Sequence, residues 1–152
     1  MLRVAAYCRV STSQEDQRNS LENQRRYFSE YISRQPDWEL VEVYADEGLS
    51  GTSSDRPAFR RMLAAAAEGK IDLIFNTVPA PILTTEVLSD MKPPCFIIDL
   101  ASLPGGVAAD TMLPDGCRVL HALSLPGKVA PLSAARAVFD TVDTILHEEG
   151  IL

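Results

Sequence analysis

Cysteine and histidine are scarce in this chain of 152 residues. Its three cysteines, Cys8, Cys95 and Cys117, form no C-x-x-C pair, and their odd number indicates reduced thiols rather than a disulfide framework or a zinc knuckle. His121 and His147 have no neighbours at metal-ligand spacing. A metal site needs a cluster of ligands, so we expect structural or surface roles for both histidines and no bound metal.

Long apolar runs and a targeting sequence are also absent. No stretch approaches the ~18 apolar residues that a membrane span requires. The start, MLRVAAYCRV, is too short for a signal-peptide core and has no cleavage pattern. We therefore expect a cytoplasmic protein with no membrane partner.

Basic residues are fewer than acidic residues, which gives the chain a net charge of −7 and a pI near 4.8. This balance argues against a protein that holds nucleic acid through a bulk positive field. The apolar content of 46% and charged content of 23% are typical of a soluble globular protein, and we expect residues 1–152 to form a single domain.

The composition changes near residue 70. Residues 1–70 contain 10 of the 14 basic and 11 of the 21 acidic residues, whereas residues 71–152 contain 4 basic and 10 acidic residues. Only 2 of the 10 prolines, Pro36 and Pro57, precede this point. The two parts therefore have different composition, as two unrelated sequences would.

Short apolar runs alternate with segments of helical periodicity along the chain. Asn19 or Ser20 is a candidate cap for a helix that ends near Arg34, and Asp55 for a second helix with Pro57 in its first turn. Gly69 has the sequence position of a glycine that ends the second helix. A short helix follows a cap at Thr84 or Thr85, and another runs over 133–147. The expected strands are 3–9, 39–45, 71–75, 95–100 and 118–123.

This alternation predicts a three-layer α/β/α fold around a mainly parallel five-stranded sheet, ordered 2-1-3-4-5. Functional residues in such folds lie at the carboxyl ends of the strands. Here those ends are the loop after the first strand, residues 9–19, and the loop after the third, residues 76–81.

Arg9 and Ser11 stand two residues apart at the end of the first expected strand. This spacing places a guanidinium and a hydroxyl on the same side, where the guanidinium can bind a phosphate and activate the hydroxyl. A serine-rich loop beside a surface arginine would have the same spacing, so spacing alone leaves both interpretations open.

Several motifs of the first half closely resemble the catalytic domain of serine recombinases, the resolvase and invertase family. They are YCRVSTSQEDQ, SLENQ, YADEGLSGTSSDRPAF and RMLAAAAEGKIDLI, and they cover residues 1–74. The resemblance implies DNA recombination, in which a serine attacks a DNA phosphodiester and forms a 5′-phosphoserine link. By the same resemblance, Ser11 is the nucleophile, Arg9 the first active-site arginine, Gln24 a family glutamine, Asp46 the acidic residue and Arg56 the arginine after the glycine-containing loop.

The chain departs from that family after the third expected strand. The family has a segment of the type S-R-x-x-R-N or D-R-L-x-R there, followed by a long dimerisation helix, whereas this chain has FNTVPAPILTTEV without any lysine or arginine. The next basic residues are Lys92 and Arg118. We also expect no DNA-binding tail. The implied partners are DNA, held weakly, and a second copy of the chain, with weak or no recombinase activity.

The second half resembles a different family. FNTVPAPILTTEVLSDMKPPCFIIDLASLPGGV and LSLPGKVAPLSAAR, within residues 75–152, are similar to the carboxyl-terminal part of the dinucleotide-binding polypeptide of dipicolinate synthase from spore-forming bacteria. This resemblance implies a Rossmann-like fold with two loops lining the nicotinamide side of a cleft. However, Gly105-Gly106 and Gly127 form no G-x-G-x-x-G turn, so no cofactor is expected.

Three functional hypotheses remain open at this point. The chain is a recombinase-type enzyme, a non-catalytic chimera of a mobile element with a sporulation gene, or a dinucleotide-binding protein. Because both parents are parallel α/β folds, we expect the halves to share one sheet, with modest stability where their side chains were not selected together.

Overall fold

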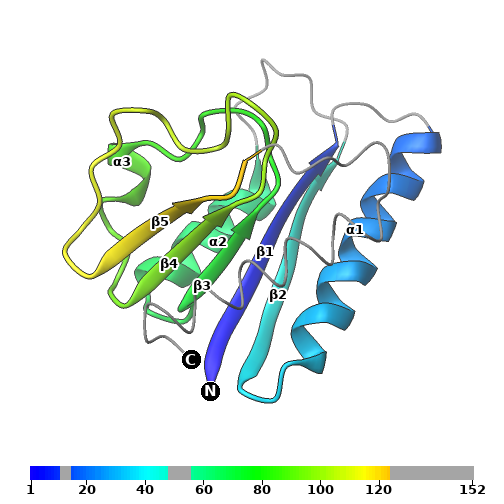
Figure 1. Cartoon of the computed structure of the whole chain (residues 1–152), viewed down its shortest axis with the longest axis horizontal. Helices are drawn as coiled ribbons and strands as arrows, with labels where there is room; N and C mark the ends of the chain where they lie inside the picture. Colours follow the sequence, from blue (N-terminus) through cyan, green and yellow to red (C-terminus); the bar gives the residue numbers. More distant parts are fainter. Residues whose placement is uncertain (11–14, 48–55, 124–152) are drawn as a thin grey trace.

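The computed structural model describes residues 1–10, 15–47 and 56–123, and the side chains of that part except residues 10 and 15–20. The expected alternation of strands and helices is present (Figure 1). The elements are β1 (Leu2–Val10), α1 (Glu15–Arg34), β2 (Trp38–Glu47), α2 (Pro57–Ala67), β3 (Leu73–Asn76), α3 (Thr85–Leu88), β4 (Cys95–Asp99) and β5 (Cys117–His121).

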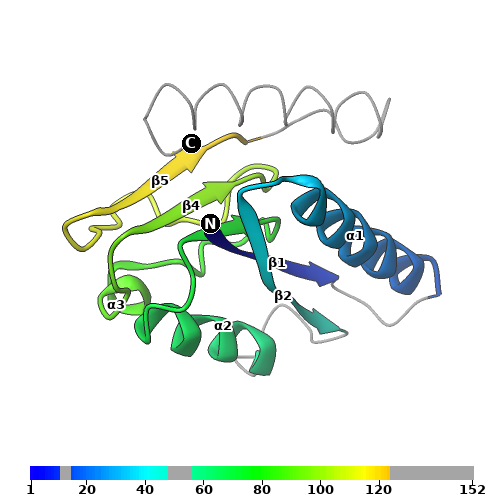
Figure 2. The same cartoon turned by 90° about the horizontal axis from the view of Figure 1, so that it is seen from below.

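The strands form one five-stranded sheet in the order β2-β1-β3-β4-β5, and every pairing is parallel. This confirms the order 2-1-3-4-5. Helix α1 covers one face of the sheet, and α2 and α3 lie on the other (Figure 2). The order reverses between β1 and β3, so the carboxyl ends of these two strands mark the switch point where such folds place their sites.

Strand β1 is buried on both faces because it lies between β2 and β3. Ala5 and Tyr7 join the core on the α2 side with Phe59, whereas Val4 and Ala6 join the core on the α1 side. Side chains alternate along a strand, so a run without polar interruptions suits a central strand covered by helices on both faces.

The apolar core continues across the change in composition. Strand β3 pairs with β1 on one side and with β4 on the other, and Ile74 lies opposite both Ala5 and Ile97. All three side chains are buried in the same cluster. The two halves of the sequence therefore contribute strands to one continuous sheet, as expected.

Helix α1 begins at Glu15, so the prediction of a cap at Asn19 or Ser20 is wrong. The first turn, Glu15 to Arg18, is entirely polar and shows no apolar periodicity. Glutamate, glutamine and arginine are nevertheless good helix formers.

The start of α2 also differs from the expectation. The cap position is Arg56 rather than Asp55, and no side chain of the cap residue bonds to the helix. Asp55 lies outside the described residues. Pro57 in the first turn is confirmed, and so is Gly69, which follows the last turn with φ of 71°. This left-handed conformation costs glycine little.

The other boundaries match the sequence pattern closely. Thr84 caps α3 and accepts a hydrogen bond from the Val87 amide at 3.4 Å. The expected helix over 133–147 lies outside the described residues. Within the described part of the chain, no helix is long and apolar enough to cross a membrane.

Candidate functional site at the carboxyl ends of the strands

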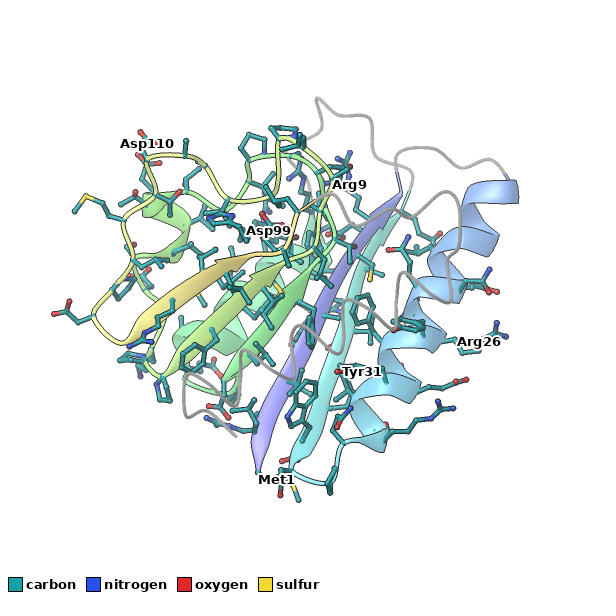
Figure 3. All side chains as sticks on the ribbon, viewed as in Figure 1. Met1, Arg9, Arg26, Tyr31, Asp99 and Asp110 are labelled. Carbon is teal, nitrogen blue, oxygen red and sulfur yellow. The ribbon has the colours of Figure 1, made fainter. Side chains whose placement is uncertain are left out.

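The carboxyl ends of β1 and β2 bring together residues far apart in the sequence. Arg9 lies opposite Asp46 in the register of these two strands, two residues beyond the opposed pair Tyr7 and Tyr44. Figure 3 shows Arg9 at this end of the sheet, with Asp99 at the corresponding end of β4. Two polar clusters therefore share one edge of the sheet.

Asp46 is the centre of the first cluster. Its carboxylate is only 4% exposed and accepts a hydrogen bond from the Tyr7 hydroxyl at 2.9 Å. It also accepts bonds from the backbone amides of Ala58 at 3.0 Å and Phe59 at 3.1 Å, in the first turn of α2. A carboxylate here satisfies unpaired amides and interacts favourably with the helix dipole. Asp46 thus replaces the missing side-chain cap of α2 from a neighbouring strand.

Two guanidiniums surround this cluster. Arg9 is on the same face of β1 as Tyr7, and Arg56 is the cap residue of α2. Burial, followed by the Asp46 carboxylate, raises the pKa of Tyr7 well above its ordinary value, while the charges of Arg56 and Arg9 act in the opposite direction. The Nε atom of Arg56 is buried and has no hydrogen-bond acceptor among the described residues.

The structure therefore brings together three of the five residues predicted for the site: Arg9, Asp46 and Arg56. Ser11, the expected nucleophile, lies outside the described residues, one position after the end of β1 at Val10. Tyr7 was not singled out from the sequence. Its spacing of two residues from Arg9 on a strand was the available indication, because residues i and i+2 share a face.

Gln24 lies elsewhere, on α1 and therefore on the other side of the sheet from α2. Its Oε1 is 3.2 Å from the Thr77 hydroxyl, which is also 3.1 Å from the Tyr7 carbonyl oxygen. These contacts join α1 to the segment that follows β3. Gln24 is thus linked to the first cluster through the backbone of Tyr7, without touching Asp46.

The neighbouring cysteine is not a candidate nucleophile. Cys8 is fully buried between β2 and β3, and burial raises the pKa of its thiol to about 12. A thiol with such a pKa carries almost no thiolate at neutral pH.

The second cluster is built on Asp99, which is fully buried at the end of β4. Its Oδ1 accepts a hydrogen bond from Asn76 Nδ2 at 2.9 Å, and its Oδ2 accepts one from the Gly106 amide at 2.8 Å. The Ala101 and Val107 amides bond to the same carboxylate, each at 3.3 Å. Asp99 thereby holds the loop over 101–107 against the end of β3.

Close packing at Gly106 explains one of the two glycines in this loop. A Cβ at this position would lie 1.9 Å from Asn76 Nδ2 and 2.9 Å from the Val78 carbonyl oxygen. Gly106 is therefore required for packing, and the hydrogen bond of its amide faces inward to Asp99. The Asp99 cluster is a structural clamp.

Cations are sparse after β3. Between Thr77 and Leu123 the lysines and arginines are Lys92 and Arg118. Lys92 lies beside Gly69 at the end of α2, and Arg118 pairs with Phe96 near the start of β5. Both positions are remote from the carboxyl end of β1. Among the described residues, no group of acidic, histidine or cysteine side chains could hold a metal ion.

Comparison with known proteins agrees with the division of the chain. Residues 4–78 match the family model described as "Resolvase, N terminal domain". The fold of the chain is also that of a solved structure, the catalytic domain of ISC1926 TnpA, an IS607-like serine recombinase, with a TM-score of 0.51 at 17% identity over 97% of this chain and 85% of the other.

A second similarity is to a different family. The curated dipicolinate synthase polypeptide of Bacillus subtilis (strain 168) is 41% identical over 78 residues, which are 51% of this chain and 26% of that protein. The chain therefore spans about a quarter of the length of this curated relative. The solved structure of dipicolinate synthase from Bacillus subtilis is 26% identical, with a TM-score of 0.46 over 97% of this chain and 46% of the other. Both resemblances expected from the sequence are confirmed.

Proposed function

We propose that the chain carries a serine-recombinase-type DNA strand-transfer centre with impaired turnover. Ser11 is the nucleophile, and Arg9 and Arg56 bind the scissile phosphate. The observation that supports this most strongly is the convergence of Arg9, Arg56 and the Asp46–Tyr7 pair at the carboxyl end of β1, one residue before Ser11.

The chemical step is a phosphoryl transfer without a cofactor. The Ser11 Oγ forms a bond to phosphorus, its proton passes to water, and the bond from phosphorus to the 3′ oxygen breaks. The 3′ oxygen takes up a proton and leaves as a hydroxyl. Negative charge grows on the non-bridging oxygens, and preorganised guanidiniums stabilise it. Reversal with a different 3′ hydroxyl rejoins the strands.

Asp46 serves in this proposal as a positioning residue rather than as the base. Its oxygens accept three hydrogen bonds inside the core. They orient the first turn of α2, and with it Arg56 at the cap position. Gln24 is also a positioning residue: it contacts the Thr77 hydroxyl, which in turn contacts the backbone of β1 at Tyr7.

The proposed impairment follows from the sequence that continues the sheet. Residues 77–91 contain no lysine or arginine where the family resemblance implies two arginines. The loss of a single transition-state donor lowers a rate by about 10²–10³. The acidic second half also weakens attraction to DNA, because phosphate contacts with basic side chains dominate DNA affinity.

Covalent trapping tests this proposal. The full chain is incubated with nicked duplexes that contain crossover sites of related recombinases, and adducts are separated on denaturing gels. The expected result is a slowly accumulating protein–DNA adduct that Ser11→Ala abolishes and that the matched variant Ser13→Ala retains. An adduct that survives Ser11→Ala, or no adduct on any site, overturns the proposal and favours a non-catalytic chimera.

A second candidate function rests on the similarity to dipicolinate synthase. Under this alternative the loops after β3 and β4 are the remainder of a dinucleotide site. Titration of the full chain with NAD⁺ and NADP⁺ by calorimetry tests it. Saturable binding would support this alternative, whereas the absence of heat up to millimolar dinucleotide would exclude it.

We propose that residues 1–152 form one cooperatively folding domain, located in the cytoplasm, that binds DNA weakly and self-associates as a homodimer. One thermal transition, with the same midpoint by near- and far-ultraviolet circular dichroism, is expected for one domain. Two separate transitions would contradict it, and sedimentation velocity would test the dimer.

A further inference from the structure

An open groove lies between α2 and α3, outside the polar clusters described above. It has a volume of about 330 Å³ and is lined by Arg56, Phe59, Arg60, Leu63, Ile82 and Val87. The four lining residues from α2 and its cap follow the spacing of one helical stripe. Ile82 and Val87 come from the opposite wall, in α3 and the segment that leads to it.

The floor of this groove is apolar and firmly held. Phe59 is buried in the core, and Leu63, Ile82 and Val87 are half-buried and pack against the same cluster. The floor is therefore an extension of the core that remains open to solvent. Contact with an apolar ligand would remove this surface from water, which favours binding.

One end of the groove is cationic. Arg56 and Arg60 are four residues apart, so they are neighbours on the surface of α2. The first turn of this helix contains no acidic residue, and its positive dipole end points the same way. The nearby Asp46 carboxylate is already committed to Tyr7 and to two backbone amides. Arg56 and Arg60 therefore place two guanidiniums beside the apolar floor.

We propose that this groove binds a small organic anion with an apolar body. The anionic group lies against Arg56 and Arg60, and the body covers Phe59, Leu63 and the facing wall. The volume is at the lower end of ligand pockets, which span ≈ 300–1,000 Å³, and it suits a molecule of one or two rings rather than a macromolecule. This site is separate from the phosphoryl-transfer proposal, apart from the shared Arg56.

The test uses 2-naphthoate as the probe and its uncharged isostere 2-naphthamide as the control ligand. Isothermal calorimetry on the full chain should give saturable binding of one 2-naphthoate and at least tenfold weaker binding of 2-naphthamide. Arg60→Gln should weaken naphthoate binding about five- to tenfold. The matched variant Arg61→Gln removes a guanidinium one residue away that pairs with Glu42 outside the groove, and should leave the affinity within twofold.

A second readout keeps the test independent of folding effects. Amide chemical shifts on addition of naphthoate should change over α2 and residues 82–88 and little elsewhere, and the circular dichroism spectra of both variants should match that of the parent chain. Equal affinity for the acid and the amide, equal loss in Arg60→Gln and Arg61→Gln, or no saturation at the solubility limit would each overturn the proposal.

Discussion

The Tyr7 hydroxyl donates a hydrogen bond of 2.9 Å to Asp46 Oδ2 inside the core, directly below the end of β1. Because Asp46 also accepts the first free amides of α2, one carboxylate joins β1, β2 and α2. It thereby fixes the distance between the strand that carries Arg9 and the helix that begins after Arg56. The candidate site depends on this junction even though Asp46 itself faces inward.

Substitution of Asp46 by asparagine should destabilise the fold strongly. The amide group would turn a donor toward Tyr7 or the helix amides, and an unsatisfied buried group costs about 1–3 kcal/mol. We expect the free energy of unfolding in urea to fall by about 2–3 kcal/mol. The matched exposed variant Asp90→Asn should change it by less than about 0.5 kcal/mol, and equal effects of the two would refute the junction.

Substitution of Tyr7 by phenylalanine removes one donor and leaves the ring in place. The free energy of unfolding should fall by about 1–1.5 kcal/mol. This is the usual contribution of one buried hydrogen bond, or slightly more, because the acceptor is a carboxylate. In a double-mutant cycle with Asp46→Asn, the combined loss should be smaller than the sum of the single losses by at least ~0.5 kcal/mol. Strict additivity would show that the two groups do not interact.

Acid should weaken the fold partly through Asp72. The hydrogen bond from the Arg3 guanidinium holds the pKa of Asp72 below its ordinary value, and Nε of Arg3 is 2.9 Å from Oδ2. A group whose pKa is lowered in the folded state stabilises the fold above its unfolded pKa of about 4, and this stabilisation is lost as the pH falls through the folded value.

Urea midpoints between pH 2 and pH 7 measure this effect. The parent chain should be more stable than Asp72→Asn near neutral pH, and the difference should shrink steadily below about pH 4. The exposed variant Asp90→Asn should follow the parent. A difference between the parent and Asp72→Asn that persists unchanged at pH 2 would mean that ionisation of Asp72 contributes nothing.

Two glycine substitutions separate packing from backbone conformation. Gly106→Ala would place a methyl group within 1.9 Å of Asn76 Nδ2, which bonds to buried Asp99. Overpacking and a broken buried bond together should cost about 3 kcal/mol or more. In Gly69→Ala the new Cβ would make only an ordinary van der Waals contact with the Lys92 side chain, at 3.6 Å, but the φ of 71° disfavours alanine, so this change should cost only about 1–2 kcal/mol. The reverse order would contradict the clamp at Asp99.

The sheet was predictable because its strands are short apolar runs separated by helix-length segments. Order, direction and the two-sided cover of β1 all followed from that alternation. The start of α1 was not predictable, because a polar first turn has no apolar periodicity that would distinguish it from a loop. The cap of α2 was also misplaced, since the group that satisfies its amides is Asp46, which is far from the helix in sequence but adjacent in space.

The candidate site was predictable only in part. The resemblance to recombinases selected Arg9, Asp46 and Arg56, and the structure brings these three together. The resemblance could not show that the Asp46 oxygens face Tyr7 and α2, because their orientation depends on how α2 packs against β2. The inward-facing role of Asp99 and the groove at Arg60 had no indication in the sequence. Each depends on where the segment after β3 returns to the sheet.

In the proposed reaction, Ser11 attacks a phosphodiester held by Arg9 and Arg56. Tandem mass spectrometry of trapped adducts after nuclease and trypsin digestion tests it most directly, because Ser11 lies in the tryptic peptide over residues 10–18, together with Thr12 and Ser13. We expect a nucleotide phosphate on the Ser11 hydroxyl, with the yield reduced in Arg9→Ala and Arg56→Ala. A nucleotide on Thr12, Ser13 or Tyr7, or an unmodified peptide from every substrate, would contradict it.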